Sequence, residues 1–286
     1  MTGAAPTDHF SDVDKALEKW RQGDVILTPT FNFLHLAKLT QPLTPAAQQA
    51  QPPPAAVPNP DPEIIETVAD GFIVITQTCD LVRDAKNKPY ANLALLRPAA
   101  TPEEFNQTRR CERPAFAYVP AVANRNLIAD LNRIVTVEKS ILASFARTPG
   151  FATEVEAEAF AAALSRHRRR FAFPDAFNTA IAKFQKRFKD RAGKNSDEGR
   201  HVDALSEIRV SGSPSWDAEK VAITLWLIKR GDPAKQDWLR WLAEWVKLID
   251  QTGRYVLDGE PRLRRLEDMH ASEYLASHQL DLDHLS

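Results

Sequence analysis

Eight of the twenty prolines of this chain lie between residues 41 and 62, where they alternate with alanine and glutamine. Proline has no backbone N–H and a fixed φ angle, so a segment this rich in proline is not expected to join a helix or a sheet. We therefore predict a disordered, extended insertion over residues 41–62 that interrupts the first domain. A docking site for a proline-reading partner is the alternative for the same segment.

The overall composition is that of a globular protein. The chain has 286 residues, of which 43% are hydrophobic and 26% are charged, and this length suits one or two domains. The formal net charge of −1 excludes a protein that wraps nucleic acid with a uniformly basic surface. Two cysteines cannot build a disulfide framework, which favours a reducing compartment.

Membrane and secretory signals are not expected. The longest apolar runs, Phe72–Thr76 and Val221–Ile228, are far shorter than the roughly 20 residues of a membrane span. Residues 1–14 contain acidic side chains and no apolar stretch of secretory length. We expect a cytoplasmic protein with no membrane partner, and its oligomeric state is left open.

Short strands separated by turns dominate the first half of the chain. β-Branched and aromatic side chains predict strands at Val25–Leu27, Gly71–Thr76, Ala91–Leu96, Ala115–Val119 and Arg133–Glu138. Thr101–Arg109 opens with Thr-Pro-Glu-Glu and predicts a helix. This pattern indicates a small barrel or rolled sheet within a β-rich module that spans residues 1–145.

Two of these segments resemble the opening of the PemK/MazF-type toxin family. Gly23-Asp24-Val25-Ile26-Leu27 is followed by Gly71-Phe-Ile-Val-Ile-Thr-Gln-Thr78, and the family likewise has a Gly-Asp-apolar strand, a loop and a second apolar strand. The resemblance covers only the N-terminal part of the chain. It implies an SH3-like barrel and, by analogy, an endoribonuclease that cuts single-stranded RNA. Asp70-Gly71 stands where the family has Arg-Pro, so the catalytic Arg and Thr of the family are not carried over to this chain.

Residues 146–286 are predicted to form an α+β module. Thr153–Arg170 and Pro174–Lys189 have helical spacing, and a hairpin of Glu207–Ser211 and Val221–Ile228 follows. A helix rich in tryptophan is expected after Asp232-Pro233. The predicted fold class is thus α+β: a small SH3-like β-barrel with a proline-rich insertion, then a helical segment and a β-hairpin-plus-helix module.

Four polar side chains follow the strand at residues 71–76, and strand ends are common places for reactive groups. The catalytic candidates are Thr76, Gln77, Cys79 and Asp80. A nucleophilic Cys79 would need its pKa lowered by a helix N-terminus or by a neighbouring histidine. The histidines that could serve as the base are distant in sequence: His35, His167 and His201. The adjacent Asp80 would oppose thiolate formation. The alternative is structural, with Cys79 packed as a small apolar residue and Asp80 capping the next turn.

Residues 166–200 contain eleven Arg and Lys residues and four acidic residues, a local charge of +7. Such a concentration on a nearly neutral chain is typical of a surface that binds phosphate groups or an acidic partner. The predicted contacts are Arg166, Arg168, Arg169, Arg170, Lys183, Lys186 and Arg187. A solvated helix face, or pairing with the acidic tail at Asp281 and Asp283, would explain the same charges.

Cofactor motifs are absent from the sequence. No P-loop, dinucleotide fingerprint or metal-type spacing of His and Cys is present, and Glu219 and Lys220 are adjacent where a metal nuclease separates acid and lysine by one residue. We expect no cofactor and no metal. Three functions remain: a non-catalytic accessory protein of a bacterial toxin–antitoxin or phage-defence system that contacts RNA, DNA or a protein encoded nearby; a PemK/MazF-like endoribonuclease or cysteine-dependent hydrolase acting at residues 76–80; or a structural assembly subunit.

Overall fold

The structure is a computed structural model, and it describes residues 9–51, 61–169, 171–230 and 238–280. The chain divides into two compact units, Met1–Arg168 and Arg169–Ser286. Both combine helices with antiparallel strand pairing, which confirms the α+β class. The division lies after Arg168 and not near residue 145, because Phe160 of helix α6 (Glu154–Arg169) packs into a core of the first unit.

The first unit is built on a five-stranded antiparallel sheet with the order β1-β4-β5-β7-β6. Its strands are β1 (Val25–Ile26), β4 (Gly71–Val74), β5 (Tyr90–Pro98), β6 (Phe116–Ala117) and β7 (Leu127–Glu138). Val25 lies opposite Ile73, so the segments before and after the proline-rich tract share one sheet, as the strand pattern predicted. Strands β1 and β6 end this order without pairing with each other, so the described strands form an open sheet and no closed barrel.

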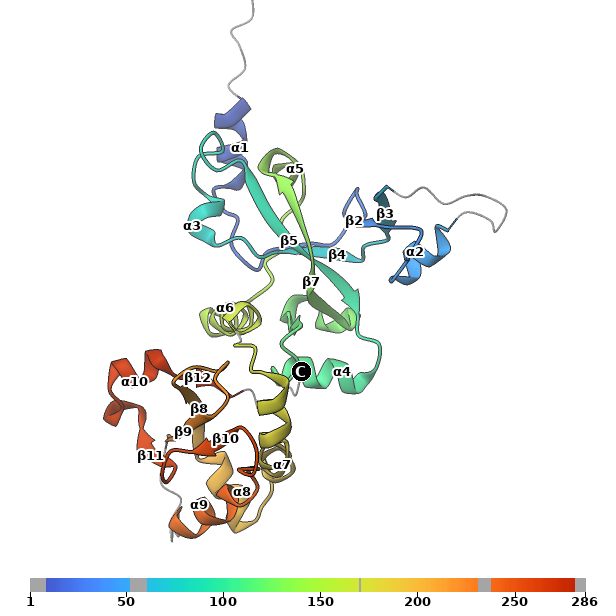
Figure 1. Cartoon of the computed structure of the whole chain (residues 1–286). Helices are drawn as coiled ribbons and strands as arrows, with labels where there is room; N and C mark the ends of the chain where they lie inside the picture. The colour runs from blue at the N-terminus through green and yellow to red at the C-terminus, as the bar shows by residue number, and fades with distance from the viewer. Residues whose placement is uncertain (1–8, 52–60, 170, 231–237, 281–286) are drawn as a thin grey trace, which may run out of the picture. The chain divides into compact units, whose positions relative to one another are not determined.

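Both faces of this sheet are buried. Phe72 and Val74 point into a core with Leu17 and Trp20, whereas Ile73 points to the opposite core, which contains Phe160. The first core is covered by α1 (His9–Leu17), α3 (Thr78–Leu81) and α5 (Lys139–Ala143), which gather near one end of β5 and β7 (Figure 1). The opposite core, which contains Ile73 and Phe160, lies under α6 and the 3-10 helix η1 (Pro120–Arg125). Burial on two sides explains why β4 is continuously apolar.

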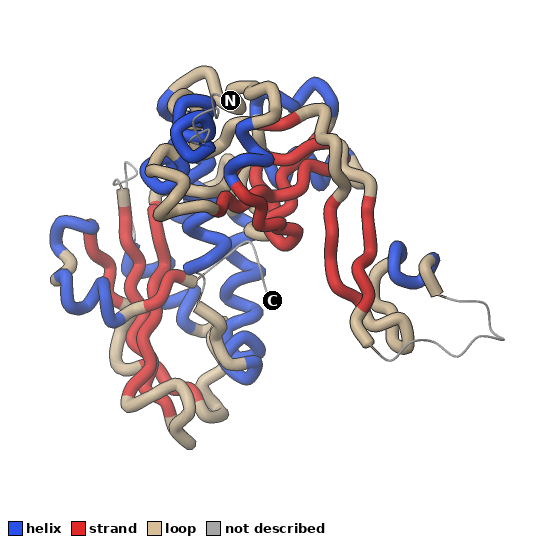
Figure 2. Tube along the Cα trace, turned by 90° about the horizontal axis from the view of Figure 1, so that it is seen from above, coloured by secondary structure: helices blue, strands red, loops and turns tan. Residues whose placement is uncertain are grey.

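A two-stranded ribbon, which we call the arm, stands apart from the main sheet. It consists of β2 (Phe33–Ala37) and β3 (Glu63–Thr67), paired antiparallel, and Figure 2 shows it projecting from the sheet with helix α2 (Pro45–Gln49) at its far end. Helix α2 lies inside the tract predicted to be irregular, and the prediction is wrong there. Pro45 occupies the first turn, where no N–H is needed, and Thr44 caps the helix by accepting a hydrogen bond from the N–H of Ala47. Residues 52–60 of the tract lie outside the described residues.

The second unit has a sheet with the order β10-β9-β8-β12, and β11 also pairs with β9. The hairpin of β8 (Leu205–Ser213) and β9 (Val221–Lys229) confirms the sequence prediction. Three shorter strands were not predicted: β10 (Tyr255–Leu257), β11 (Arg262–Arg265) and β12 (His278–Gln279). The described helices of this unit are α7 (Asp175–Arg191), α8 (Asp197–Asp203), η2 (Leu266–Asp268), α9 (Trp238–Val246) and α10 (Ala271–Ala276). The start predicted for α9 at Asp232-Pro233 lies outside the described residues.

The second unit is closed by aromatic packing between its helices and its sheet. Phe177, Ile181, Phe184 and Phe188 form one buried stripe along α7, as their spacing predicted. Phe188 contacts Trp245 of α9 with ring centroids 4.6 Å apart. This packing leaves the opposite side of α7 in solvent.

Candidate functional site

The polar groups at the exit of β4 hold the chain in place. The hydroxyl of Thr76 accepts a hydrogen bond from the N–H of Asn92 at 2.7 Å, which ties it to the neighbouring strand β5. The hydroxyl of Thr78 accepts one from the N–H of Gln22 at 3.0 Å, and the Gln22 amide donates to the carbonyl of Ile75 at 2.9 Å. These contacts join the turn between β4 and α3 to the segment that follows α1. They stabilise the fold.

Cys79 is exposed on the first turn of α3. Its thiol lies 3.7 Å from the side-chain oxygen of Gln77, a contact between neighbouring residues. The three histidines considered as bases bond elsewhere: His35 to Thr44, His167 to the carbonyl of Pro114, and His201 to the carbonyl of Asp197. The described residues therefore bring no imidazole to the thiol, and the helix on whose first turn Cys79 lies, α3, has only four residues.

Asp80 belongs to a charged cluster at the end of α3. Its carboxylate lies 3.5 Å from Arg83 and 3.9 Å from Lys88, and all three side chains are exposed. Its backbone carbonyl and that of Arg83 accept hydrogen bonds from the Lys139 ammonium at 2.9 and 2.8 Å. Lys139 is only 1% exposed, and burial lowers the pKa of its ammonium while nearby carboxylates oppose that shift. Lys139 thus caps α3 from inside the protein.

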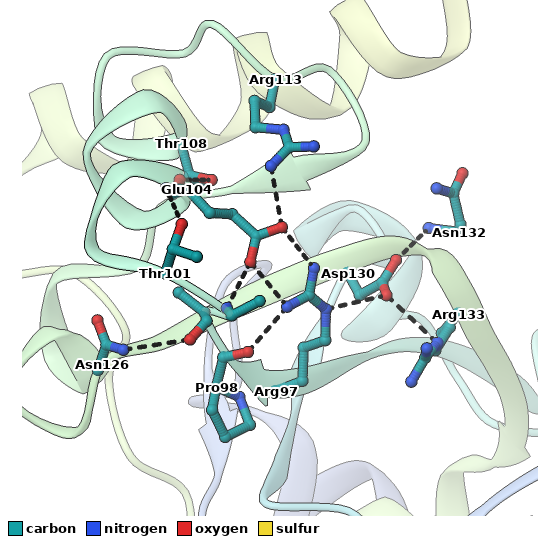
Figure 3. A network of polar contacts seen from close by, with 12 residues as sticks. Arg97, Pro98, Thr101, Glu104, Thr108, Arg113, Asn126, Asp130, Asn132 and Arg133 are labelled. Carbon is teal, nitrogen blue, oxygen red and sulfur yellow. Dashed lines mark hydrogen bonds and ion pairs between the residues drawn. The ribbon is translucent and has the colours of Figure 1, made fainter. Parts of the chain in front are cut away.

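A second charged network lies where α4 (Pro102–Arg109) meets β5 and β7 (Figure 3). Arg97 donates two hydrogen bonds to the buried carboxylate of Glu104, at 2.9 and 3.1 Å, and its Nε lies 3.5 Å from buried Asp130. Arg113 also donates to Glu104 at 3.0 Å. The hydrogen bond from Arg97, above all, lowers the pKa of Glu104. None of these residues was predicted from the sequence as part of a site.

Its geometry is that of a structural cluster. The guanidinium of Arg97 lies 4.4 Å from the ring centre of Phe116, so one face of Arg97 is covered. The second acid of the network, Asp130, is held by Arg133 at 3.3 Å. The two buried carboxylates are each paired with arginines, two of which, Arg113 and Arg133, are partly exposed.

The basic segment at residues 166–200 falls into two parts. Arg166 donates to the carbonyl of Cys111, so this arginine anchors α6 to the first unit. Arg168 is exposed and ends the first unit, Arg169 is exposed and begins the second, and Arg170 lies outside the described residues. The arginine run is therefore shared between two units and is not one described surface.

The arginines of α7 are used inside the second unit. Arg187 donates to the carboxylate of Glu198 on α8 at 2.8 Å, and Nε of Arg191 lies 2.9 Å from the other oxygen. Glu198 is 4% exposed and also accepts a hydrogen bond from the indole of Trp245 at 3.0 Å. Glu198 therefore connects α7, α8 and α9, and the predicted binding residue Arg187 is one of its partners.

The lysines of α7 differ from these arginines. Lys183, Lys186 and Lys189 follow each other at three-residue spacing, and all three are exposed. The described residues provide no ion pair to any of them, although Asp190 is exposed on the same helix and the charge of Lys183 contributes to lowering the pKa of Asp250. Lys183 and Lys186 were predicted as contacts and Lys189 was not. This row, with exposed Lys194 beyond the helix end, is what we call the lysine face.

Comparison with protein-family models, with curated proteins and with solved structures found no match for this chain. Among the residues that the structure describes, no group of three or more His, Cys, Asp and Glu side chains could hold a metal ion. In the same residues, no helix has the length and apolar character needed to cross a membrane.

Proposed function

We propose that this protein is a non-catalytic binding protein that contacts the phosphate groups of RNA or DNA through the lysine face of α7. The observation that carries this proposal is that the arginines and the lysines of α7 have different surroundings. Arg187 and Arg191 are paired with Glu198, whereas Lys183, Lys186 and Lys189 extend into solvent. Ammonium groups that form no ion pair among the described residues can neutralise phosphates and so release the counterions condensed on the nucleic acid, and this is the main source of sequence-independent affinity.

The helix is a suitable platform for such contacts. Three residues of α-helix advance about 4.5 Å and turn by about 60° short of a full circle, so the three lysines are spread over about a third of the helix circumference on its solvent side. The buried stripe of Phe177, Ile181, Phe184 and Phe188 and the contacts to Glu198 hold the helix against its unit. A rigid base reduces the ordering cost that flexible basic tails carry on binding.

The residues at the exit of β4 favour a binding protein over an enzyme. Thr76 is hydrogen-bonded within the sheet, Asp80 is paired with Arg83 and Lys88, and no described histidine reaches Cys79. We further propose an accessory or regulatory role in a bacterial toxin–antitoxin or phage-defence system, and an SH3-like origin of the first sheet. The Gly23–Leu27 and Gly71–Thr78 segments, which pair as β1 and β4, support this part.

Fluorescence anisotropy with labelled single-stranded RNA and double-stranded DNA tests the binding. The variant K183E/K186E/K189E is compared with K15E/K19E/K86E, which changes the net charge equally at exposed lysines of the first unit. We expect the α7 variant to lose at least tenfold in affinity and the control to stay within about threefold. No binding by the parent protein, or equal losses in the two variants, would contradict the proposal.

An activity assay separates binding from catalysis. The parent protein is incubated with the same RNA, and intact RNA is expected after incubation. If the parent protein cleaves RNA and Cys79→Ala or Gln77→Ala abolishes the cleavage, our proposal is wrong and the protein is an endoribonuclease or hydrolase acting at residues 76–80.

A further inference from the structure

One face of the arm is apolar and exposed. The side chains of Leu34, Leu36, Ile64 and Val68 are 42%, 71%, 68% and 80% exposed, respectively. Strand residues alternate between faces, so these four side chains share the face opposite to Ile65, which packs with Leu39 and Ala47 of the α2 region. The arm thus has a covered face and an uncovered one.

An isolated two-stranded ribbon is only marginally stable in water, and it needs a third strand or a packed face. Helix α2 supplies a cover on one side through a small cluster that includes Ile65 and Ala47. On the other side, Leu36 lies directly opposite Ile64 and forms an exposed apolar pair at the centre of the face. A contiguous patch of this kind is typical of an interaction surface.

Two opposite charges flank this central pair. Glu66 lies opposite Leu34, one step along the same face toward the main sheet. Lys38 lies two residues beyond Leu36 and directly after the end of β2, toward the far end of the arm. The alternation of less and more exposed side chains along β2 continues to Lys38, which is exposed, and this places it on the same face. Along the arm, from the main sheet outward, this face thus presents an acidic residue, the apolar pair and a basic residue.

This order is complementary to itself. Two such faces can pack against each other in opposite directions about a two-fold axis that lies in the interface, across the strands at the Leu36–Ile64 pair. The apolar pairs then meet at the centre. Lys38 then lies over Leu34 of the partner subunit, next to the partner's Glu66 on the adjacent strand and within reach of its carboxylate, and the symmetry repeats this pairing on the other side. A face with charges of one sign, or without charge, would lack this property.

We infer that the uncovered face of the arm binds a second copy of this chain, face to face and antiparallel. This goes beyond the proposed function, because the arm belongs to the first unit and the lysine face to the second.

Light scattering coupled to size-exclusion chromatography of the full chain tests the inference by charge exchange. The parent protein is expected at twice its 32.1 kDa chain mass at tens of micromolar. In Lys38→Glu, and likewise in Glu66→Lys, both cross-subunit pairs become repulsive, and each variant alone is expected to elute as a monomer. The double variant K38E/E66K restores opposite charges and is expected to form the dimer again.

Mixing the two single variants gives the sharpest outcome. One chain then has two acids on the arm face and the other has two lysines, so the mixture should form a heterodimer although neither variant dimerises alone. Leu36→Glu should be monomeric and should not be rescued by mixing. Leu275→Glu, at an exposed leucine of the second unit, is the control and should keep the dimer mass.

A monomeric parent protein would overturn the inference, and so would a dimer that all arm variants leave unchanged. Monomeric single variants that neither mixing nor the double exchange rescues would contradict the antiparallel register. Circular dichroism shows whether each variant is folded, so loss of the dimer is not confused with unfolding. A different protein bound through this face, with the parent chain itself monomeric, would also overturn the inference.

Discussion

Nε of Arg187 donates a hydrogen bond to the carboxylate of Glu198 at 2.8 Å, and this contact separates two kinds of basic residue on one helix. Arg187 fixes α7 to α8, whereas Lys186, its neighbour in sequence, is exposed without an ion pair among the described residues. Both residues contribute one positive charge, but Arg187 stabilises the packing of α7 on α8 and Lys186 is available to a binding partner. Stability and binding should therefore respond to different substitutions.

Substitution of Glu198 should destabilise the second unit. Glu198→Gln removes the charge that holds Arg187 and Arg191, and we expect a loss of about 2 kcal/mol in the free energy of unfolding. Lys186→Ala, on the solvent side of the same helix, should change it by less than about 0.5 kcal/mol. Urea unfolding followed by tryptophan fluorescence measures both, because five of the six tryptophans lie in this unit. Equal effects of the two substitutions would contradict the division of roles on α7.

A close approach of two glycines should make Gly150 intolerant of substitution. A Cβ atom at Gly150 would lie 2.0 Å from the backbone carbonyl oxygen of Gly23, and neither backbone can yield easily. Gly150→Ala should therefore lower the free energy of unfolding by about 3 kcal/mol. Gly253→Ala is the matched control, because a Cβ there meets nothing within 4 Å. Urea unfolding followed by circular dichroism measures both, and a Gly150→Ala protein as stable as the control would show that this contact is wrong.

The Arg97–Glu104 pair predicts a dependence of stability on pH. The hydrogen bond from Arg97 places the pKa of folded Glu104 below its ordinary value of 4.5, so the unfolded chain binds the proton more tightly. The stabilisation of the fold by ionised Glu104 is therefore complete well above pH 4.5, and it is lost as the pH falls through the pKa of Glu104 in the folded protein. Glu104→Gln should cost about 3 kcal/mol at pH 7, and this difference from the parent should shrink below pH 4.5.

Urea unfolding at several pH values between 3 and 7 checks this prediction. Glu103→Gln on the same helix is the control, since Glu103 is exposed and contacts the exposed Arg110, and its effect should be small at pH 7. A Glu104→Gln cost that stays constant down to pH 3, or grows, would contradict the assigned pairing.

The sequence predicted those parts of the fold in which burial leaves a continuous or periodic apolar pattern. β4 and β9 are apolar because their sheets are covered, and the phenylalanine stripe of α7 has the spacing of a buried helix face. β3 was missed because its two isoleucines are adjacent and flanked by glutamates, so no alternating pattern shows, and because it follows the proline-rich tract. Strands β10 and β12 are too short for a periodic signal, and their pairing with β9 and β8 depends on distant parts of the chain.

The candidate site was predicted only in part, for the same reason. The charge of residues 166–200 could be counted, but the partner of Arg187 is a buried glutamate on another helix. The network of Arg97, Glu104 and Asp130 joins two strands and a helix and has no local signature. The polar cluster at residues 76–80 was visible, yet its hydrogen bonds to Gln22 and Asn92 arise only from the tertiary fold.

The salt dependence of nucleic-acid affinity tests the central claim most directly. The dissociation constant for double-stranded DNA is measured from 50 to 200 mM salt for the parent protein and for K183A/K186A/K189A. Each phosphate contact by a lysine contributes a slope of about 0.9 in the plot of log affinity against log salt, so the variant should have a slope lower by about 2 to 3. The same slope in both proteins would show that the lysines of α7 do not bind phosphate groups.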